Sequence, residues 1–386
     1  MGMVSLQRTS PAAALLSWRQ VLAWRLNRQH LMEPASRRAL VDVAERICGL
    51  HAQLMTSAEL TLWARVKDLK RTDVSKALWE RRDLVKLWAM RGTLHLLPAR
   101  GFGTWQRALS TYDHYLRDHW LKYFDVTRAQ LEKMSAAIGE ALADRELTRE
   151  ELIAEVARLT RSKAQAEHLR SGWGSLLKPP SFQGRLCFAP SDGQNVRFTN
   201  PEAWLGGYEK PDRETARLDV VRRYLGVFGP ASNADLARWW GITPPRARRL
   251  FEALGSDAVE VEVDGLRRWC LESDLAGLTA AEVDKNLRLL PMFDQYVVAS
   301  SRDAEAVLAD AYKPLVFRKS AWISAVVLVN GRIEGVWRHE IKGKRVVVTI
   351  EPFERLPRWA GPKITAEANS LARFFGKDLE LVKPSG

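Results

Sequence analysis

The 386-residue sequence contains few cysteines and no long apolar segment. Its three cysteines, Cys48, Cys187 and Cys270, are too few for a four-cysteine zinc site or iron–sulfur cluster. The longest stretches without a charged residue, 47–58 and 320–331, have 12 residues each. A membrane-spanning helix requires roughly 18 apolar residues. The sequence therefore predicts a protein that does not enter the membrane, in the reducing setting of the cytoplasm.

Several common catalytic signatures are also missing. The sequence contains no Gly-x-x-x-x-Gly-Lys-Ser/Thr phosphate loop, no Gly-x-Gly-x-x-Gly fingerprint and no Gly-x-Ser-x-Gly elbow. His114 and His119, the one close histidine pair on an expected helix, are five residues apart. That spacing separates the two rings by about 140° around a helix, whereas zinc ligation needs them on one face. We therefore expect neither a metal nor another cofactor.

Positive charge is abundant. The chain has 59 Lys and Arg residues against 46 Asp and Glu, which gives a formal net charge of +13. Such an excess favours a polyanionic partner, because each neutralised phosphate releases counterions. A generally basic protein that binds no nucleic acid is the alternative that charge alone leaves open.

The segment 213–273 has the pattern of a winged helix. Its expected elements are, in order, a helix over 218–228, a helix over 233–240 capped by Ser232, a helix opened by Thr243-Pro244-Pro245, and strands over 258–263 and 266–271. Asp264-Gly265 is a typical hairpin turn between the two strands. The third helix would be the recognition helix, and it carries Arg246 and Arg249. A solvated helix face is the alternative role for these arginines.

Two earlier segments repeat this order of elements. In the second, Thr148 and Glu151 form a capping box for a helix, a helix-like segment over 169–177 stops at Pro179-Pro180, and strands over 184–189 and 195–199 are joined through Asp192-Gly193. In the first, expected helices over 17–28, 37–48, 57–67 and 74–81 lead into a strand region over 84–97. The sequence thus predicts three tandem winged-helix units.

The end of the chain changes character. Alternating apolar and polar residues predict strands over 324–329, 332–338 and 345–350, followed by a helix near 364–375. The expected fold class is therefore α+β and mainly helical, with a C-terminal β-rich meander or partial barrel. The predicted domains are a first winged-helix unit over 1–100, a helical connection and second unit over 101–205, a third unit over 206–275, and the β-rich element over 276–386.

The segment Gly49-Leu-His-Ala-Gln53 has an unusual context. Gly49 stands where a preceding helix would end, and Thr56 and Glu59 have the spacing of a capping box for the next helix. The residues between are then extended, and residues two apart in an extended chain point to the same side. His51 and Gln53 could therefore act together, although holding the neighbouring helix ends is the more common role for such a pair.

Four ordered motifs resemble one known family. They are Gly49-Leu-His-Ala-Gln53, Arg91-Gly-Thr-Leu-His-Leu-Leu-Pro98, Gly229-Pro-Ala-Ser-Asn-Ala-Asp235 with Trp239-Trp240-Gly241, and Leu290-Pro-Met-Phe-Asp294. Together they resemble the AlkZ-like/YcaQ-like winged-helix DNA glycosylases over nearly the whole chain. The resemblance implies three winged-helix units around a DNA channel, and an enzyme that excises bulky or crosslinking N7-alkylated guanines. The catalytic pair of that family is usually Gln-x-Gln or Gln-x-Asp, so His51 departs from the usual glutamine.

The resemblance implies roles for individual residues. His51 and Gln53 would be catalytic and would position a water molecule at the sugar of the damaged nucleotide. His95 and Asp294 match family motifs and would support the site. The expected contacts to the DNA backbone are Arg91, Arg246, Arg249, Arg318 and Lys319.

The predicted activity is that of a monofunctional DNA glycosylase that hydrolyses the N-glycosidic bond of bulky cationic N7-alkylguanine adducts. It could also unhook interstrand crosslinks or give resistance to a DNA-alkylating natural product. Its partner would be double-stranded DNA carrying alkylated guanine, and we expect a monomer in the nucleoid region of the cytoplasm. The alternative is a tandem winged-helix DNA-binding protein or transcriptional regulator without catalysis. A regulator would require a dimerisation helix that matches half-site spacing, and none stands out in the sequence.

Overall fold

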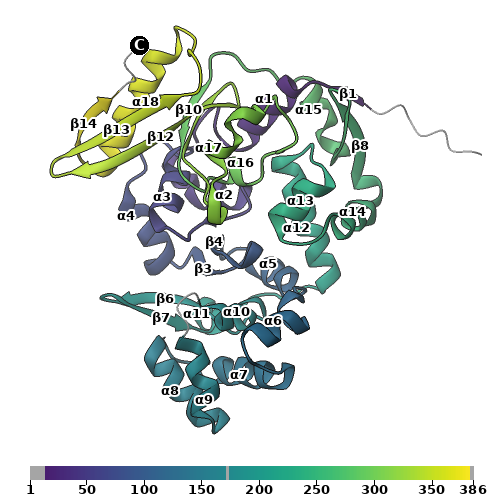
Figure 1. The fold of residues 1–386 in the computed structure, drawn as a ribbon, viewed down its shortest axis with the longest axis vertical. Helices are drawn as coiled ribbons and strands as arrows, with labels where there is room; N and C mark the ends of the chain where they lie inside the picture. Colours follow the sequence, from purple (N-terminus) through teal and green to yellow (C-terminus); the bar gives the residue numbers. More distant parts are fainter. Residues whose placement is uncertain (1–13, 171–173, 383–386) are drawn as a thin grey trace, which may run out of the picture.

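The computed structural model describes residues 14–170 and 174–382. Its class is α+β, as predicted. The described residues form three small three-stranded sheets, each accompanied by helices, and one five-stranded C-terminal sheet (Figure 1). Each small sheet with its helices contains the kinds of secondary-structure element expected of a winged-helix unit. That the three are winged-helix domains stays a prediction.

The first group of elements contains the His-x-Gln segment. Its sheet has the order β2-β4-β3 and is antiparallel throughout. The elements are α1 (Trp18–Arg28), α2 (Leu40–Arg46), β2 (Leu50–His51), α3 (Met55–Trp63), α4 (Arg71–Ser75), β3 (Leu84–Trp88) and β4 (Leu94–Pro98). The capping box predicted at Thr56 and Glu59 is wrong, because α3 begins earlier, at Met55, with Leu54 as an N-cap that makes no side-chain bond. The Glu59 carboxylate instead pairs with Arg71 at 2.8 Å.

Apart from α5 (Phe102–Leu109), which packs against α12 (Arg213–Phe228), the second group forms the lower lobe of the view in Figure 1. Its elements are α5, α6 (Asp118–Tyr123), α7 (Arg128–Ala141), β5 (Leu147–Thr148), α8 (Arg149–Thr160), α9 (Lys163–Glu167), α10 (Lys178–Phe182), β6 (Cys187–Asp192), β7 (Asn195–Thr199) and α11 (Pro201–Leu205). Thr148 caps α8 in a capping box, as predicted. Pro179 and Pro180, however, open α10 rather than ending a helix. The first strand of the hairpin lies three residues later than predicted, so that its turn falls at Gly193-Gln194.

The third group follows the sequence pattern most closely. Its elements are α12 (Arg213–Phe228), α13 (Asn233–Trp240), α14 (Pro244–Ala253), β8 (Ala258–Val263), β9 (Leu266–Leu271) and α15 (Leu275–Thr279). Ser232 caps α13, Gly241 closes it with a φ of 88°, and prolines occupy the first turn of α14. The first described strand, β1 (Ala14–Leu16), pairs in parallel with β8. β1 therefore lies with the third group.

The C-terminal sheet has the order β10-β11-β12-β13-β14. The elements of this region are β10 (Leu287–Leu290), α16 (Gln295–Val298), α17 (Lys313–Val316), β11 (Val326–Val329), β12 (Arg332–Lys342), β13 (Arg345–Pro352), α18 (Ala360–Phe375) and β14 (Asp378–Val382). Asn330-Gly331 forms the turn between β11 and β12, and both residues have the positive φ that a type I′ turn requires. The three predicted strands and the helix are present. β12, β13 and α18 are longer than predicted, and β11 begins two residues later.

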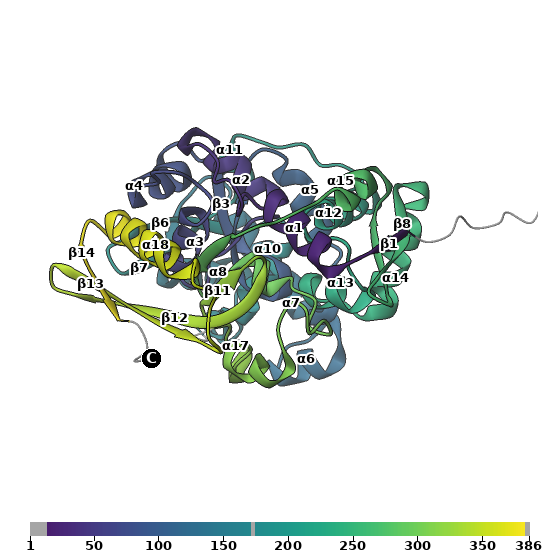
Figure 2. The same cartoon turned by 90° about the horizontal axis from the view of Figure 1, so that it is seen from above.

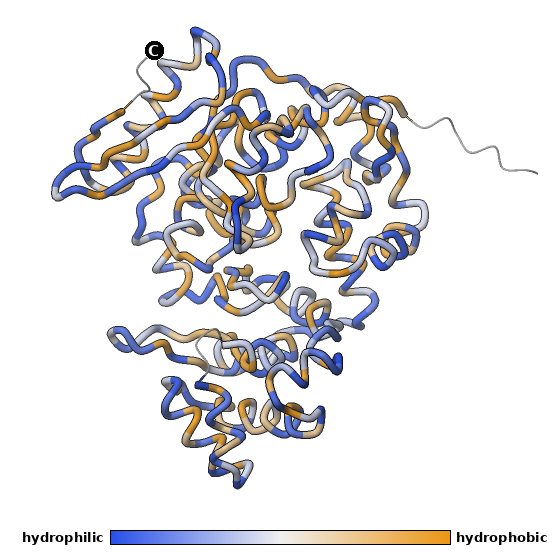
Figure 3. The backbone as a smooth tube through the Cα atoms, viewed as in Figure 1, coloured by the Kyte–Doolittle hydropathy of each residue, from blue (hydrophilic) through white to orange (hydrophobic). Residues whose placement is uncertain are grey.

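A large hydrophobic core joins the four groups. Its buried side chains run from Ala23 in α1 to Phe374 in α18, and a second, smaller core contains Leu16, Val21 and Val263 beside β1 and β8. Apolar segments lie inside, whereas the tips of the β6–β7 and β12–β13 hairpins are hydrophilic (Figure 3). Seen from above, α6 and α17 lie on the same side of the molecule (Figure 2). Among residues 14–170 and 174–382, no helix combines the length and apolar character that crossing a membrane would require.

Candidate functional site

The strand β2 presents His51 next to His95 of β4. The two histidines are directly opposite each other in the antiparallel register, so their side chains emerge from the same face of the sheet. Gly49, just before β2, has a φ of +86°, and a Cβ there would lie 2.5 Å from a methyl carbon of Leu97. A glycine is thus required for the chain to leave α2 and enter the sheet at this point.

The imidazole of His51 is nearly enclosed by aromatic rings. His51 is only 5% exposed. The ring of Phe293 stacks on it with a centroid distance of 4.7 Å and an interplanar angle of 16°, and the ring of His95 meets it edge-on at 5.4 Å. Burial, together with the smaller effect of the nearby Arg91 charge, lowers the pKa of His51 to about 3. His51 is therefore neutral at physiological pH.

His95 is completely buried. Its Nδ1 lies 3.0 Å from the backbone oxygen of Thr93, which can only accept a hydrogen bond. Burial and the neighbouring His51 hold the pKa of His95 well below its ordinary value, so the ring is neutral and its proton sits on Nδ1. The Nε2 of His95 and the Nδ1 of His51 are both buried without a hydrogen-bond partner among the described residues.

Gln53 lies two residues further along, where the strand ends. Ala52 still donates a ladder bond of 2.7 Å to the Leu94 oxygen, and its side chain is buried. Gln53 is exposed, and its Oε1 accepts a 3.4 Å hydrogen bond from the Leu94 backbone N–H. This long bond leaves the second lone pair of the amide oxygen free to accept from a water molecule. The structure gives no hydrogen bond between His51 and Gln53, and their joint action stays a prediction.

Asp294 follows Phe293 and is tied to the protein rather than open to a substrate. Its carboxylate forms two 2.7 Å hydrogen bonds with the guanidinium of Arg65, and both side chains are 0% exposed. It also accepts a 2.9 Å bond from the Tyr296 N–H, which caps α16. These bonds fix the segment in which Phe293 adopts a φ of 58° and stacks on His51. The predicted supporting role of Asp294 in the reaction stays a prediction.

Arg91 lies between β3 and β4 and connects this hairpin to α13 of the third group. Its guanidinium donates to the backbone oxygen of Trp239, and burial lowers its pKa to about 10. Two further arginines, Arg238 and Arg302, lie near enough to lower that pKa. We call Arg91, Arg238 and Arg302 the arginine cluster. Because Arg91 already binds a backbone carbonyl, its predicted contact with a DNA phosphate stays untested.

The arginine cluster carries uncompensated positive charge. Arg238 pairs with Asp235 at 2.6 Å, but Arg302 has no ion pair among the described residues. The Arg302 guanidinium lies 3.9 Å from the centre of the Phe317 ring, and burial together with Arg238 lowers its pKa to about 10. An arginine that stays charged in such a position would be stabilised by an anion.

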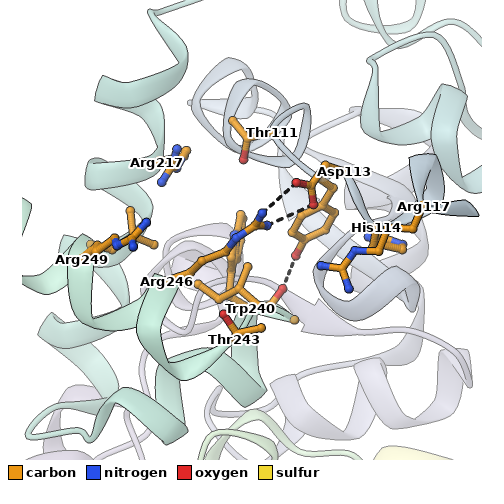
Figure 4. Close-up of a pocket in the computed structure, with 13 residues that line it drawn as sticks. Thr111, Asp113, His114, Arg117, Arg217, Trp240, Thr243, Arg246 and Arg249 are labelled. Carbon is orange, nitrogen blue, oxygen red and sulfur yellow. Dashed lines mark hydrogen bonds and ion pairs between the residues drawn. The ribbon is translucent and has the colours of Figure 1, made fainter.

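Arg246 and Arg249 lie in a pocket of about 450 Å³ between α14 and the segment after α5. Figure 4 shows Arg217 and Arg249 on one side of it, Arg117 on the other, and the Arg246–Asp113 ion pair between them. That pair is bidentate, with distances of 3.1 and 2.9 Å. We call this pocket the arginine cleft; its four guanidinium groups, from Arg117, Arg217, Arg246 and Arg249, outnumber the single carboxylate.

Arg318 and Lys319 lie at the tip of a short exposed loop. The loop is closed by a bridge between Phe317 and Ile323 and by a 2.8 Å bond from the Arg318 N–H to the Trp322 oxygen. Trp322 is 40% exposed and meets Phe293 edge-on at 5.1 Å. A chain of contacting rings thus leads from His51 through Phe293 to this basic loop.

Comparison with known proteins identifies the family. The model of the family described as "DNA glycosylase AlkZ-like" matches residues 44–374. This chain belongs to the AlkZ-like family. An "Interstrand DNA cross-link repair glycosylase" from Streptomyces sahachiroi is 36% identical over 366 residues, which are 93% of this chain and 97% of that protein. The solved structure of the Streptomyces sahachiroi DNA glycosylase AlkZ has a TM-score of 0.86 and 35% identity, and covers 95% of this chain and 99% of its own.

The structure adds residues to the AlkZ-like site that the sequence pattern did not single out. Phe293 stacks on His51, Trp322 contacts Phe293, and Arg302 belongs to the arginine cluster. Arg117 and Arg217 complete the arginine cleft. Phe293 lies directly before Asp294 in the motif Leu290-Pro-Met-Phe-Asp294, and this position could have identified it as a site residue. Trp322, Arg302, Arg117 and Arg217 lie outside the four motifs, and no sequence pattern identifies them.

The chemistry available to this AlkZ-like site is that of neutral hydrogen-bonding groups. A neutral imidazole and an amide oxygen can both accept a hydrogen bond from water and so direct it at an electrophile. Among residues 14–170 and 174–382, no group of three or more His, Cys, Asp or Glu side chains is arranged to hold a metal ion.

Proposed function

We propose that this protein is a monofunctional DNA glycosylase that releases guanines carrying bulky N7-alkyl groups, including those in interstrand crosslinks. The observation that carries the proposal is a neutral His51 and an exposed Gln53 amide on one strand end, beside uncompensated arginines. The name of the Streptomyces relative, a crosslink repair glycosylase, supports the same reaction class. The substrate is double-stranded DNA, and the protein acts as a monomer in the cytoplasm.

The reaction requires little acid or base strength. Alkylation at N7 gives guanine a positive charge, so the base leaves without prior protonation. The electron pair of the broken C1′–N9 bond neutralises the departing base, and the sugar becomes an oxocarbenium ion. Water then adds to C1′ and becomes strongly acidic as it does so. A weak acceptor such as neutral His51 or the Gln53 oxygen is sufficient to orient this water and receive its proton.

The arginines bind the DNA backbone in this proposal. The arginine cleft, the arginine cluster and the loop with Arg318 and Lys319 provide guanidinium and ammonium groups suited to phosphate. Such contacts set affinity and register and carry no sequence information. A damage-specific enzyme needs binding of this kind, because its lesions arise in any sequence.

The test is release of a modified base. Double-stranded DNA treated with a bulky N7-alkylating agent is incubated with the protein, and abasic sites are revealed as alkali-labile strand breaks. Gln53→Ala is expected to lower the rate of base release by about 100-fold, the scale of a lost water-positioning group, while DNA binding is unchanged. Gln194→Ala, at an exposed glutamine in the β6–β7 turn, is the matched control and keeps the wild-type rate.

Two results would overturn the proposal. One is equal base release by the wild type and Gln53→Ala. The other is the absence of base release together with nuclease protection of one particular sequence, which is the behaviour of a transcriptional regulator.

A further inference from the structure

The proposed role of His51 depends on which ring nitrogen carries its proton. A neutral imidazole has one N–H and one unprotonated nitrogen, and only the unprotonated nitrogen can accept a hydrogen bond from water. The Nδ1 of His51 is buried, so it does not meet bulk solvent. For His51 to orient water, Nδ1 must therefore hold the proton, and Nε2 must be free.

The imidazole of His95 has the same tautomer, so that its Nε2 is an acceptor and complements the Nδ1–H of His51. The Thr93 carbonyl requires a proton on the Nδ1 of His95, which leaves His95 Nε2 as an acceptor. That Nε2 is buried and unpartnered among the described residues, as is the Nδ1 of His51. A buried donor and a buried acceptor without partners each destabilise the folded protein.

The two rings are at the distance at which one bond would satisfy both atoms. They are opposite each other in the strand register, and their centroids are 5.4 Å apart. A ring nitrogen lies about 1 Å from its centroid, so an N–H···N bond of about 3 Å spans this separation when the two nitrogens face each other and His95 keeps its bond to Thr93. The backbone positions of β2 and β4 need not change.

We infer that His95 is a positioning residue for His51: its Nε2 accepts a hydrogen bond from the His51 Nδ1–H, and so keeps the His51 Nε2 unprotonated. This inference rests on the proposed catalytic role of His51. During the reaction the His51 Nε2 takes the proton of the attacking water, and the bond to His95 stabilises the transient positive charge on the His51 ring. The proton then passes to solvent, and His51 returns to its neutral form.

The tautomer of His51 is measured directly by NMR of the full-length protein labelled with ¹⁵N at its seven histidines. Long-range couplings distinguish a protonated from an unprotonated ring nitrogen, and the signals lost in His51→Gln identify this residue. The expected result in the wild type is a protonated Nδ1 and an unprotonated Nε2. An Nε2–H tautomer of His51 would overturn the inference. This readout does not depend on base release, so it separates failure of this inference from failure of the proposed function.

Two variants at His95 connect the tautomer to the rate. His95→Phe keeps a planar ring but removes the acceptor, so the protonated-Nδ1 form should no longer dominate at His51, and base release should fall by about 10- to 100-fold. His95→Gln places an amide oxygen near the position of the lost Nε2 and should restore the tautomer and most of the rate. Equal loss in both variants, with the His51 tautomer unchanged, would show that His95 serves only packing.

Discussion

Replacing the buried carboxylate of Asp294 should destabilise the protein far more than replacing an exposed one. Asp294→Asn removes the charge but keeps the shape and the cap on α16. Arg65 is then left fully buried with no opposite charge, since both side chains are 0% exposed. Breaking such a pair from one side costs about 3–5 kcal/mol, a large part of the roughly 5–15 kcal/mol that stabilises a typical domain.

The assay is urea unfolding followed by circular dichroism, with two comparison variants. Asp113→Asn breaks the bidentate ion pair between Asp113 and Arg246, in which the two side chains are 49% and 48% exposed. This change should lower the free energy of unfolding by less than about 1 kcal/mol. Adding Arg65→Met to Asp294→Asn removes the stranded charge and should recover about half of the loss. The reasoning fails if Asp294→Asn costs no more than Asp113→Asn, or if the double variant is no more stable than the single one.

The same variants decide whether Asp294 takes part in the reaction. If it only fixes the segment that carries Phe293, base release should recover together with stability in the double variant. Restored stability without restored base release would instead place the Asp294 carboxylate in the chemistry.

Three further predictions concern pH, the aromatic cover and DNA affinity. The pKa values of His51 and His95 are lower in the folded than in the unfolded chain, so the stability they contribute is present above about pH 6.5 and lost on acidification; relative to His95→Gln, the wild type should lose about 2 kcal/mol more of unfolding free energy between pH 7.5 and 5. Phe293→Leu should uncover His51 and raise its pKa, so that base release falls between pH 8 and 6, whereas the wild-type rate stays flat over that range. Arg249→Ala should reduce the slope of log affinity against log salt by about 0.9, and Arg158→Ala, an equal change in charge on α8, should leave it unchanged; equal slopes for both variants would remove the arginine cleft from the DNA interface.

Local signals in the sequence were sufficient to place α13, α14 and the turn between them in the third group. Ser232 caps α13 with its side-chain hydroxyl, Gly241 closes it with a left-handed backbone, and Pro244 opens α14 where no N–H is needed, so α13 and α14 begin where the sequence predicts. Local signals were ambiguous at Pro179, since a proline either follows a helix or opens one. At Thr56 a correct capping spacing did not determine the start of α3.

The surroundings of His51 could not be predicted in this way. They are made by segments far apart in the chain, with His95 across a strand pair and Phe293 held by the distant Arg65–Asp294 pair. The sequence pattern identified His51 and Gln53 as a pair, but not the burial that makes His51 neutral. Burial arises from tertiary packing, and no local spacing encodes it.

The charges around the site limit what each group can do. An imidazolium at His51 about 6 Å from a developing oxocarbenium ion would cost about 3 kcal/mol at an effective dielectric constant of about 20, so a ring kept neutral by burial suits this reaction better than an ordinary histidine. The arginine cluster poses the same problem, because its guanidinium groups would also repel the sugar cation. Phosphates that bind Arg302 and its neighbours would cancel this repulsion. The positive charge of the site is therefore compatible with the proposed reaction only when the DNA backbone lies against it.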